Sequence, residues 1–164
     1  DGWIELVNSL DKTRGVPVIV NTAARNSTGV ARYGQTLKST LGELGRTMVT
    51  MWVINRQRDS LELLADYLDA MPAGADHQVH VVRNGYFGSA EKFQLYNGSQ
   101  LKQRIEEGGG LTLDFPDLAD RVADQMATQR LTIQGALKEM PLGHRAELIR
   151  WRDDAFKVLG RVMT

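Results

Sequence analysis

The sequence predicts an α/β fold: a mainly parallel sheet with flanking helices and a helical C-terminal cap. Short apolar runs alternate along the chain with stretches of helical periodicity, an order typical of βαβ units with right-handed crossovers. The 164 residues are 42% hydrophobic and 24% charged, which is ordinary for a globular domain with a real core. We therefore expect one domain over residues 1–164, made of an α/β part at 1–127 and C-terminal helices at 128–164.

Four short apolar runs are the predicted strands. The first run, Val16–Val20, is nearly all apolar, as expected for a strand that is buried on both faces. Pro17 then has to lie at the start of that strand, because proline cannot donate to a central ladder. The other three runs cover residues 48–54, 79–82 and 111–113.

Helical periodicity predicts helices before, between and after these strands. Their expected ranges are 3–11, 28–44, 59–71, 89–107, 116–126, a short stretch after Thr132 and a long stretch toward the C-terminus. Asp59 and Glu62 resemble a capping box, and Pro116 suits the first turn of a helix. The helix over 89–107 is expected to break at Asn97-Gly98, with Ser99 as a new N-cap.

Charge and cysteine content exclude several classes of function. Lys+Arg and Asp+Glu are both 20, so the chain lacks the basic excess of a dedicated DNA clamp. The absence of cysteine excludes disulfides and thiolate metal sites and fits a cytoplasmic location. No apolar run reaches the roughly 18 residues of a membrane span. Basic and acidic residues interleave in the last helix, which a solvated face explains better than DNA contact, the alternative for that helix.

The candidate binding residues follow the predicted strands. Asn21 ends the first strand and Asn84 the third, at the edge where open α/β sheets bind ligands. The carboxamide of Asn84 suits the edge of a purine, and Tyr86 and Phe87 beside it are able to stack on a base. Turn chemistry is the alternative explanation for both asparagines, and ordinary packing is the alternative for the two aromatic residues.

Other catalytic or metal-binding patterns are missing from the sequence. The three histidines, His77, His80 and His144, do not have the spacing of a zinc site. Gly108–Gly110 follows a predicted helix, and no Gly-Lys-Ser/Thr comes after it, so it is not a phosphate-binding loop. These patterns therefore give no basis for predicting a metal site or a catalytic residue.

Four stretches, taken in order, resemble the ParA/MinD-like deviant-Walker P-loop ATPases. They are Val16–Ala24, Val82–Gly88, Leu113–Leu118, and the tail formed by Arg130–Leu137 and Phe156–Leu159. Within that family they are most similar to the plasmid-borne branch, which contains the TraL, StbB and MobD conjugation, mobilisation and plasmid-stability proteins.

This resemblance implies a role for each matching residue. Asn84 would contact adenine, with Tyr86 beside it, and Pro116 would form a wall of the base pocket. Asn21 would stand where the family often has an aspartate that holds a magnesium-bound water, and an amide offers that water no charge. The implied cofactors are ATP and Mg²⁺.

The phosphate-binding loop of that family, with its strand and helix, has no counterpart in this sequence. The resemblance therefore implies that residues 1–164 are the C-terminal two-thirds of a longer ATPase, whose N-terminal βα unit is missing here. We expect this chain alone to bind nucleotide weakly or not at all and to be inactive as an enzyme.

Two functions follow from these observations. The first is a fragment of an ATPase that acts in plasmid stability, partition or conjugative mobilisation. The alternative is a catalytically inactive α/β module that binds other proteins. The expected partners are plasmid or mobilisation proteins and a second copy of the chain, because a sheet that lacks a strand has an open edge.

Overall fold

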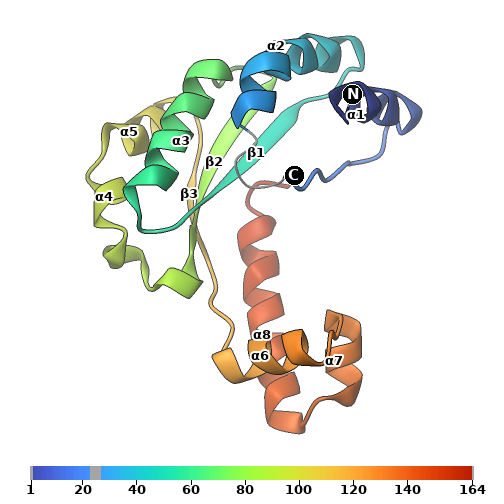
Figure 1. Ribbon diagram of the computed structural model, residues 1–164, viewed down its shortest axis with the longest axis vertical. Helices are drawn as coiled ribbons and strands as arrows, with labels where there is room; N and C mark the ends of the chain where they lie inside the picture. The colour runs from blue at the N-terminus through green and yellow to red at the C-terminus, as the bar shows by residue number, and fades with distance from the viewer. Residues whose placement is uncertain (1, 23–26, 164) are drawn as a thin grey trace.

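The computed structural model describes residues 2–22 and 27–163 and confirms the α/β fold (Figure 1). Its sheet has three parallel strands in the order β1-β2-β3. The strands are β1 (Met48–Ile54), β2 (His77–Asn84) and β3 (Thr112–Phe115).

Helices and short turns connect the strands and continue beyond the last one. The α-helices are α1 (Gly2–Lys12), α2 (Ser27–Glu43), α3 (Arg58–Ala70), α4 (Gln94–Asn97), α5 (Gln100–Glu107), α6 (Asp120–Thr128), α7 (Ile133–Glu139) and α8 (Leu142–Leu159). Two 3-10 turns, η1 (Gly85–Phe87) and η2 (Ala90–Lys92), follow β2. Within the described residues, no helix is long and apolar enough to cross a membrane.

Strand β2 lies in the centre of the sheet, and its two faces belong to two hydrophobic clusters. On one face, Val79 and Val81 pack with Leu64 and Leu68 of α3 and with Ile105 of α5. The other face has a smaller cover, which comes from the end of the chain: Val82 of β2 and Leu113 of β3 pack with Val162. Helices therefore cover the sheet unequally.

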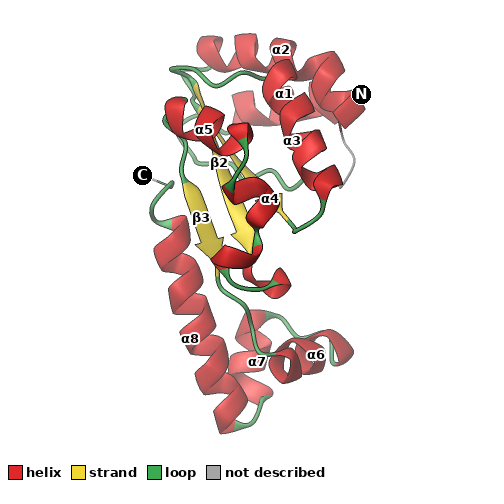
Figure 2. Cartoon of the chain, turned by 90° about the vertical axis from the view of Figure 1, so that its left-hand side faces the viewer, coloured by secondary structure: helices red, strands yellow, loops and turns green. Residues whose placement is uncertain are grey.

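Helices α6, α7 and α8 form a lobe with its own core, beyond the carboxyl ends of the strands (Figure 2). Val122, Ala136, Met140 and Leu148 are the buried residues of this core. Helix α8 starts in the lobe and runs back along the molecule until Val158 reaches the cluster under the sheet. One helix thus belongs to both parts.

The prediction of a buried strand at Val16–Val20 is wrong. These residues form no strand and pair with none, and Ile19 is 82% exposed. A strand buried on both faces needs a neighbouring strand and a cover on each face. Among the described residues, β1 pairs with β2 alone, so the segment has no place in the sheet.

Two helix starts also differ from the prediction, whereas two others are confirmed. Gln57 is the N-cap of α3 without a side-chain hydrogen bond, so the capping box at Asp59 is absent. Pro116 lies in a loop, since α6 begins only at Asp120. The break at Asn97-Gly98 is confirmed, and the Ser99 and Thr132 hydroxyls cap α5 and α7 as predicted.

We predict that Gly110→Ala destabilises the fold. A Cβ at this position would lie 2.0 Å from the carbonyl oxygen of Val79, and backbone of a central strand cannot move aside cheaply. The expected loss in the free energy of unfolding is about 1–3 kcal/mol, measured by urea denaturation. Gly143→Ala is the matched control, because nothing lies within 4 Å of its added Cβ and a helix favours alanine by up to about 1 kcal/mol. Equal stability of the two variants would contradict the prediction.

Candidate functional site

The loops after β2 and β3 are in backbone contact at the carboxyl edge of the sheet. A Cβ on Gly85 would lie 2.4 Å from the carbonyl oxygen of Phe115 and 2.9 Å from the amide nitrogen of Asp117. Only glycine allows this approach without a shift. Gly85 is therefore required by the way the two loops pack, and Asn84 caps the turn that Gly85 begins.

Asn84 caps the turn that follows β2. Its Oδ1 accepts a hydrogen bond from the backbone N–H of Tyr86 at 3.1 Å. This geometry supports turn chemistry, the alternative explanation for this residue. The carboxamide NH₂ of Asn84 donates to no group among the described residues and remains available at the edge. Asn84 is thus able to act in the turn and as a hydrogen-bond donor at once.

Tyr86 and Phe87 form an exposed aromatic pair beside Asn84. Their side chains are 70% and 39% exposed, and their rings meet edge to face with centroids 5.2 Å apart. The guanidinium of Arg56, in the loop after β1, donates to the carbonyl oxygen of Phe87 at 3.3 Å. Sequence reasoning missed Arg56, although its position just after a strand was a signal for it. An aromatic pair with an adjacent cation is a surface suited to binding.

Pro116 lies in the loop after β3, and helix α8 holds that loop. The indole N–H of Trp151 donates to the carbonyl oxygen of Pro116 at 2.9 Å, and the Trp151 ring packs edge to face on Phe115. Arg150 donates to the carbonyl oxygen of Asp117 at 3.3 Å. Sequence reasoning missed these contacts. They attach one wall of the candidate site to the helical lobe.

Arg83 is neutralised within the sheet and adds no free charge to the edge. It makes two hydrogen bonds to the Asp114 carboxylate, at 2.6 and 2.9 Å, and one to the Asn97 carboxamide at 2.7 Å. Its side chain is only 14% exposed. This network connects β2, β3 and α4, so its function is to fix the site's supporting strands.

The structure brings three of the four predicted site residues to one edge and leaves the fourth elsewhere. Asn84 and Tyr86 belong to the end of β2, and Pro116 contacts the adjacent Gly85. Asn21 lies in the exposed segment between α1 and α2. No hydrogen bond joins Asn21 to the other three within residues 2–22 and 27–163.

Three basic residues of α8, Arg150, Arg152 and Lys157, are paired with acidic neighbours. Arg150 contacts Glu147 at 2.6 Å and Asp154 at 3.1 Å, and Lys157 contacts Asp154 at 2.9 Å. Hydrogen bonding to Arg150 lowers the pKa of the Glu147 carboxyl. This arrangement supports the solvated face that the sequence favoured over DNA contact.

A buried polar cluster lies at the opposite end of the sheet. The Thr50 hydroxyl lies 2.6 Å from the Tyr67 hydroxyl and 2.9 Å from Nε2 of His77, whose ring is fully buried. Burial lowers the pKa of His77 and raises that of Tyr67. His80 is also buried, and its pKa is lowered for the same reason. These groups are uncharged at neutral pH and act in packing.

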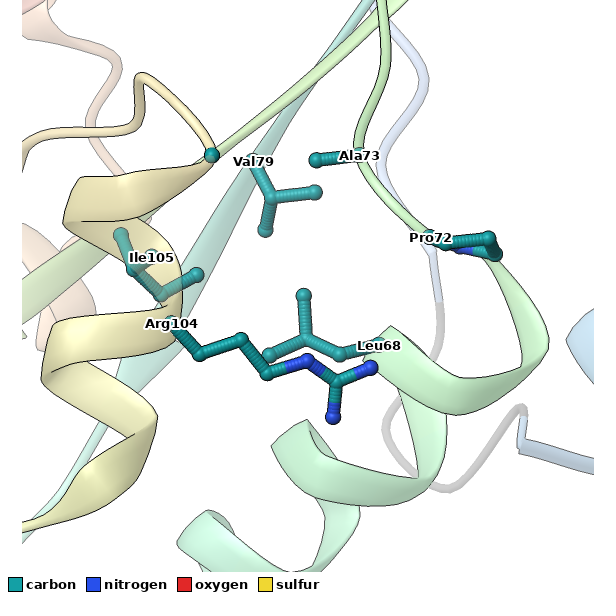
Figure 3. A pocket seen from close by; sticks show the side chains of 7 residues that line it. Leu68, Pro72, Ala73, Val79, Arg104 and Ile105 are labelled. Atoms are coloured by element: carbon teal, nitrogen blue, oxygen red, sulfur yellow. The ribbon is translucent and has the colours of Figure 1, made fainter.

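The hollow at this end is small (Figure 3). It holds about 190 Å³, below the roughly 300–1,000 Å³ of typical ligand pockets. It is lined by Leu68, Pro72, Ala73, Val79, Arg104, Ile105 and Gly108. Its one charged group, Arg104, contacts Asp69 at 2.7 Å.

Within the described residues no group of three or more His, Asp or Glu is placed to hold a metal ion. The carboxyl edge is therefore the candidate site.

Comparison with known proteins gives one clear relationship. The chain is 59% identical over 163 residues to Protein MobD of Acidithiobacillus ferrooxidans, and the match covers 99% of this chain and 70% of that protein. No model of a protein family matches the chain, and no solved structure matches it.

These findings correct the resemblance to the ParA/MinD-like P-loop ATPases. The relationship found is with MobD, no family model matches the chain, and the sheet of the described residues has three strands. Identification of the chain as part of such an ATPase is therefore wrong. The binding roles that the resemblance implied for Asn21, Asn84, Tyr86 and Pro116 no longer have its support.

We predict that stability falls as the pH is lowered through 6.5. Since burial lowers the native pKa of His77 and His80 below the ordinary histidine value of 6.5, the unfolded chain binds protons more readily. The stabilisation is fully present above pH 6.5 and is lost progressively below it. Urea denaturation at a series of pH values between about 8 and 5 measures the free energy of unfolding. This range extends about 1.5 pH units to either side of the ordinary histidine pKa.

The variant His77→Gln should flatten this pH dependence, and His77→Gln with His80→Gln should flatten it further. His144→Gln is the control, because that side chain lies on the partly exposed side of α8. If the stability of the double variant depended on pH as strongly as that of the wild type, the two histidines would not be the cause of the pH dependence.

Proposed function

Because the chain belongs to the MobD family, we propose that it takes part in plasmid mobilisation. The observation that supports this most is the 59% identity to Protein MobD along 99% of the chain. Plasmid DNA is processed in the cytoplasm, so we propose that location too. The proposed partners are other plasmid or mobilisation proteins.

Within mobilisation, we propose that the chain is a binding module without catalytic activity of its own. The carboxyl edge offers recognition groups: the aromatic pair Tyr86 and Phe87, the cation of Arg56 and the amide donors of Asn84. The ion pair near this edge, Arg83 with Asp114, holds two strands together. Aromatic and arginine side chains are also the types that dominate protein interfaces.

A second candidate role for the same edge is weak binding of a purine base. The free NH₂ of Asn84, the exposed Tyr86 ring and the nearby Pro116 favour this ligand over a purely aliphatic one. No segment of the sequence has the pattern of a phosphate-binding loop. We propose that ATP and Mg²⁺ gain no phosphate contacts here.

We predict that Tyr86→Ala combined with Arg56→Ala lowers mobilisation at least about tenfold, as expected when interface anchors are removed. Donor cells that carry a mobilisable plasmid deleted for this gene, complemented in trans, provide the measurement. Both side chains are exposed, so protein level and Tm should not change.

Phe156→Ala is the matched control, because Phe156 is an aromatic residue of similar exposure, 64%, on the outer side of α8. If Phe156→Ala and the Tyr86→Ala, Arg56→Ala double variant gave equal mobilisation frequencies, the carboxyl edge would not be the binding surface. Normal mobilisation by the deletion itself would overturn the role in mobilisation.

We also predict that adenosine and ATP bind this chain with similar, weak affinity. Kd values of about 1 mM or weaker are expected for both in excess Mg²⁺, because only the base is contacted. NMR titration measures both. Asn84→Asp keeps the oxygen that caps the turn and loses the NH₂ donors, so it should weaken adenosine further. ATP binding more than tenfold tighter than adenosine, about 1.4 kcal/mol, would show phosphate contacts and contradict the proposal.

A further inference from the structure

Strand β1 has one paired edge and one open edge. The N–H of Met48 donates to the carbonyl oxygen of Asp76 at 2.8 Å, on the side of β2. Backbone groups alternate between the two edges of a strand, so Val49, Met51 and Val53 direct their N–H and C=O groups to the open edge. No strand pairs with them among the described residues.

The open edge lacks the features that usually prevent further pairing. Strand β1 contains no charged residue, proline or glycine over its seven residues. Two side chains on its poorly covered face are strongly exposed, Val49 at 43% and Val53 at 58%. A long, uncharged, apolar edge of this kind is a template for another strand.

The same chain carries an uncharged segment suited to that edge. Val16, Val18, Ile19 and Val20 are β-branched and are 57%, 39%, 82% and 50% exposed. The backbone hydrogen bonds of this run are confined to its start, where Val16 bonds to Thr13 and to the Arg46 guanidinium. Residues 17–20 are thus apolar, exposed and without backbone hydrogen-bond partners among the described residues.

We propose that two copies of the chain associate by reciprocal strand addition. The segment Val16–Val20 of each copy pairs with the open edge of β1 in the other copy. Pro17 is compatible with this pairing, because it would lie at the beginning of the added strand. Each copy gives and receives one strand, so the pair closes with twofold symmetry and leaves no free β1 edge.

Two observations favour a second copy over a different partner. Neither the donor segment nor the acceptor edge carries charge, so no ionic complement is needed from another protein. The net charge of zero also removes long-range repulsion between copies. Figure 1 shows the segment after α1 apart from β1, and no strand among residues 2–22 and 27–163 pairs with the open edge.

The size of the contact sets its expected strength. The donor run has five residues and β1 has seven, so each copy contributes fewer than the roughly 20–30 residues of a standard interface. Arg46 fixes the start of the donor segment through a 2.9 Å hydrogen bond to the carbonyl oxygen of Val16, which reduces the ordering cost. We expect a dimer with a Kd of about 1–100 µM.

Sedimentation velocity of the 164-residue chain across that range tests the proposal. The wild-type chain should change from monomer to dimer, and Ile19→Lys should weaken the dimer at least tenfold without changing Tm. Val53→Pro should do the same, since it removes an N–H from the open edge and leaves the β1–β2 ladder intact. Val53→Thr and Leu142→Lys are the controls, the latter at a 75% exposed position in the helical lobe.

Cysteine cross-linking keeps the proposal testable if Val53→Pro does not fold. The chain has no cysteine, so Ile19→Cys and Val53→Cys chains can be mixed and oxidised against a clean background. A mixed disulfide dimer is expected, and Leu142→Cys should not form one with Ile19→Cys. A monomer at every concentration would overturn the proposal. A dimer that Ile19→Lys does not weaken would also overturn the proposal, because it would form by direct pairing of two β1 edges or through another face.

Discussion

Strand β2 pairs with a parallel neighbour on each of its edges, and the positions of both ends of the sheet depend on this double pairing. It pairs with β1 from His77 to Arg83 and with β3 from Val81 to Asn84. The amino end of β2 thus carries the buried imidazole of His77 into the core. At the carboxyl end of β2, Asn84 lies beside Phe115 of β3. A change that weakened either ladder would therefore disturb the buried cluster and the candidate site together.

The cover of the sheet is unequal, and this explains where apolar surface stays exposed. Helices α3 and α5 close one face with a continuous core, whereas the other face has a smaller cover from the end of the chain, which reaches Val82, Leu113 and Met51. Val49 and Val53 of β1 lie beyond that cover. Since apolar surface in water costs about 25 cal/mol per Å² relative to its burial, association that covers this strip is favoured. The exposed run at Val16–Val20 adds to the same driving force.

Local signals in the sequence predicted the local structure well and long-range contacts poorly. Strands β1 and β2 are apolar runs of strand length, and the caps at Ser99 and Thr132 depend on atoms only three residues apart. Whether Val16–Val20 forms a strand depends instead on the presence of a neighbouring strand, which no local pattern reveals. The same holds for the hydrogen bond from Trp151 to Pro116, whose partners are 35 residues apart. Of the candidate site, the asparagine and the aromatic pair were predicted. Arg56 was missed although it directly follows a strand, and the lobe contacts depend on residues too far apart in the sequence for any local pattern to reveal.

The loop after β3 links the candidate site to the helical lobe. On one side, Phe115 and Asp117 press against Gly85, directly beside Asn84 and Tyr86. On the other side, the Trp151 indole and the Arg150 guanidinium hold the same loop to α8. A displacement of α8 therefore moves the backbone against which the turn at Gly85 rests. Packed groups in van der Waals contact transmit such displacements because protein interiors have few voids to absorb them. These contacts would couple the binding proposed for the carboxyl edge to the position of the lobe.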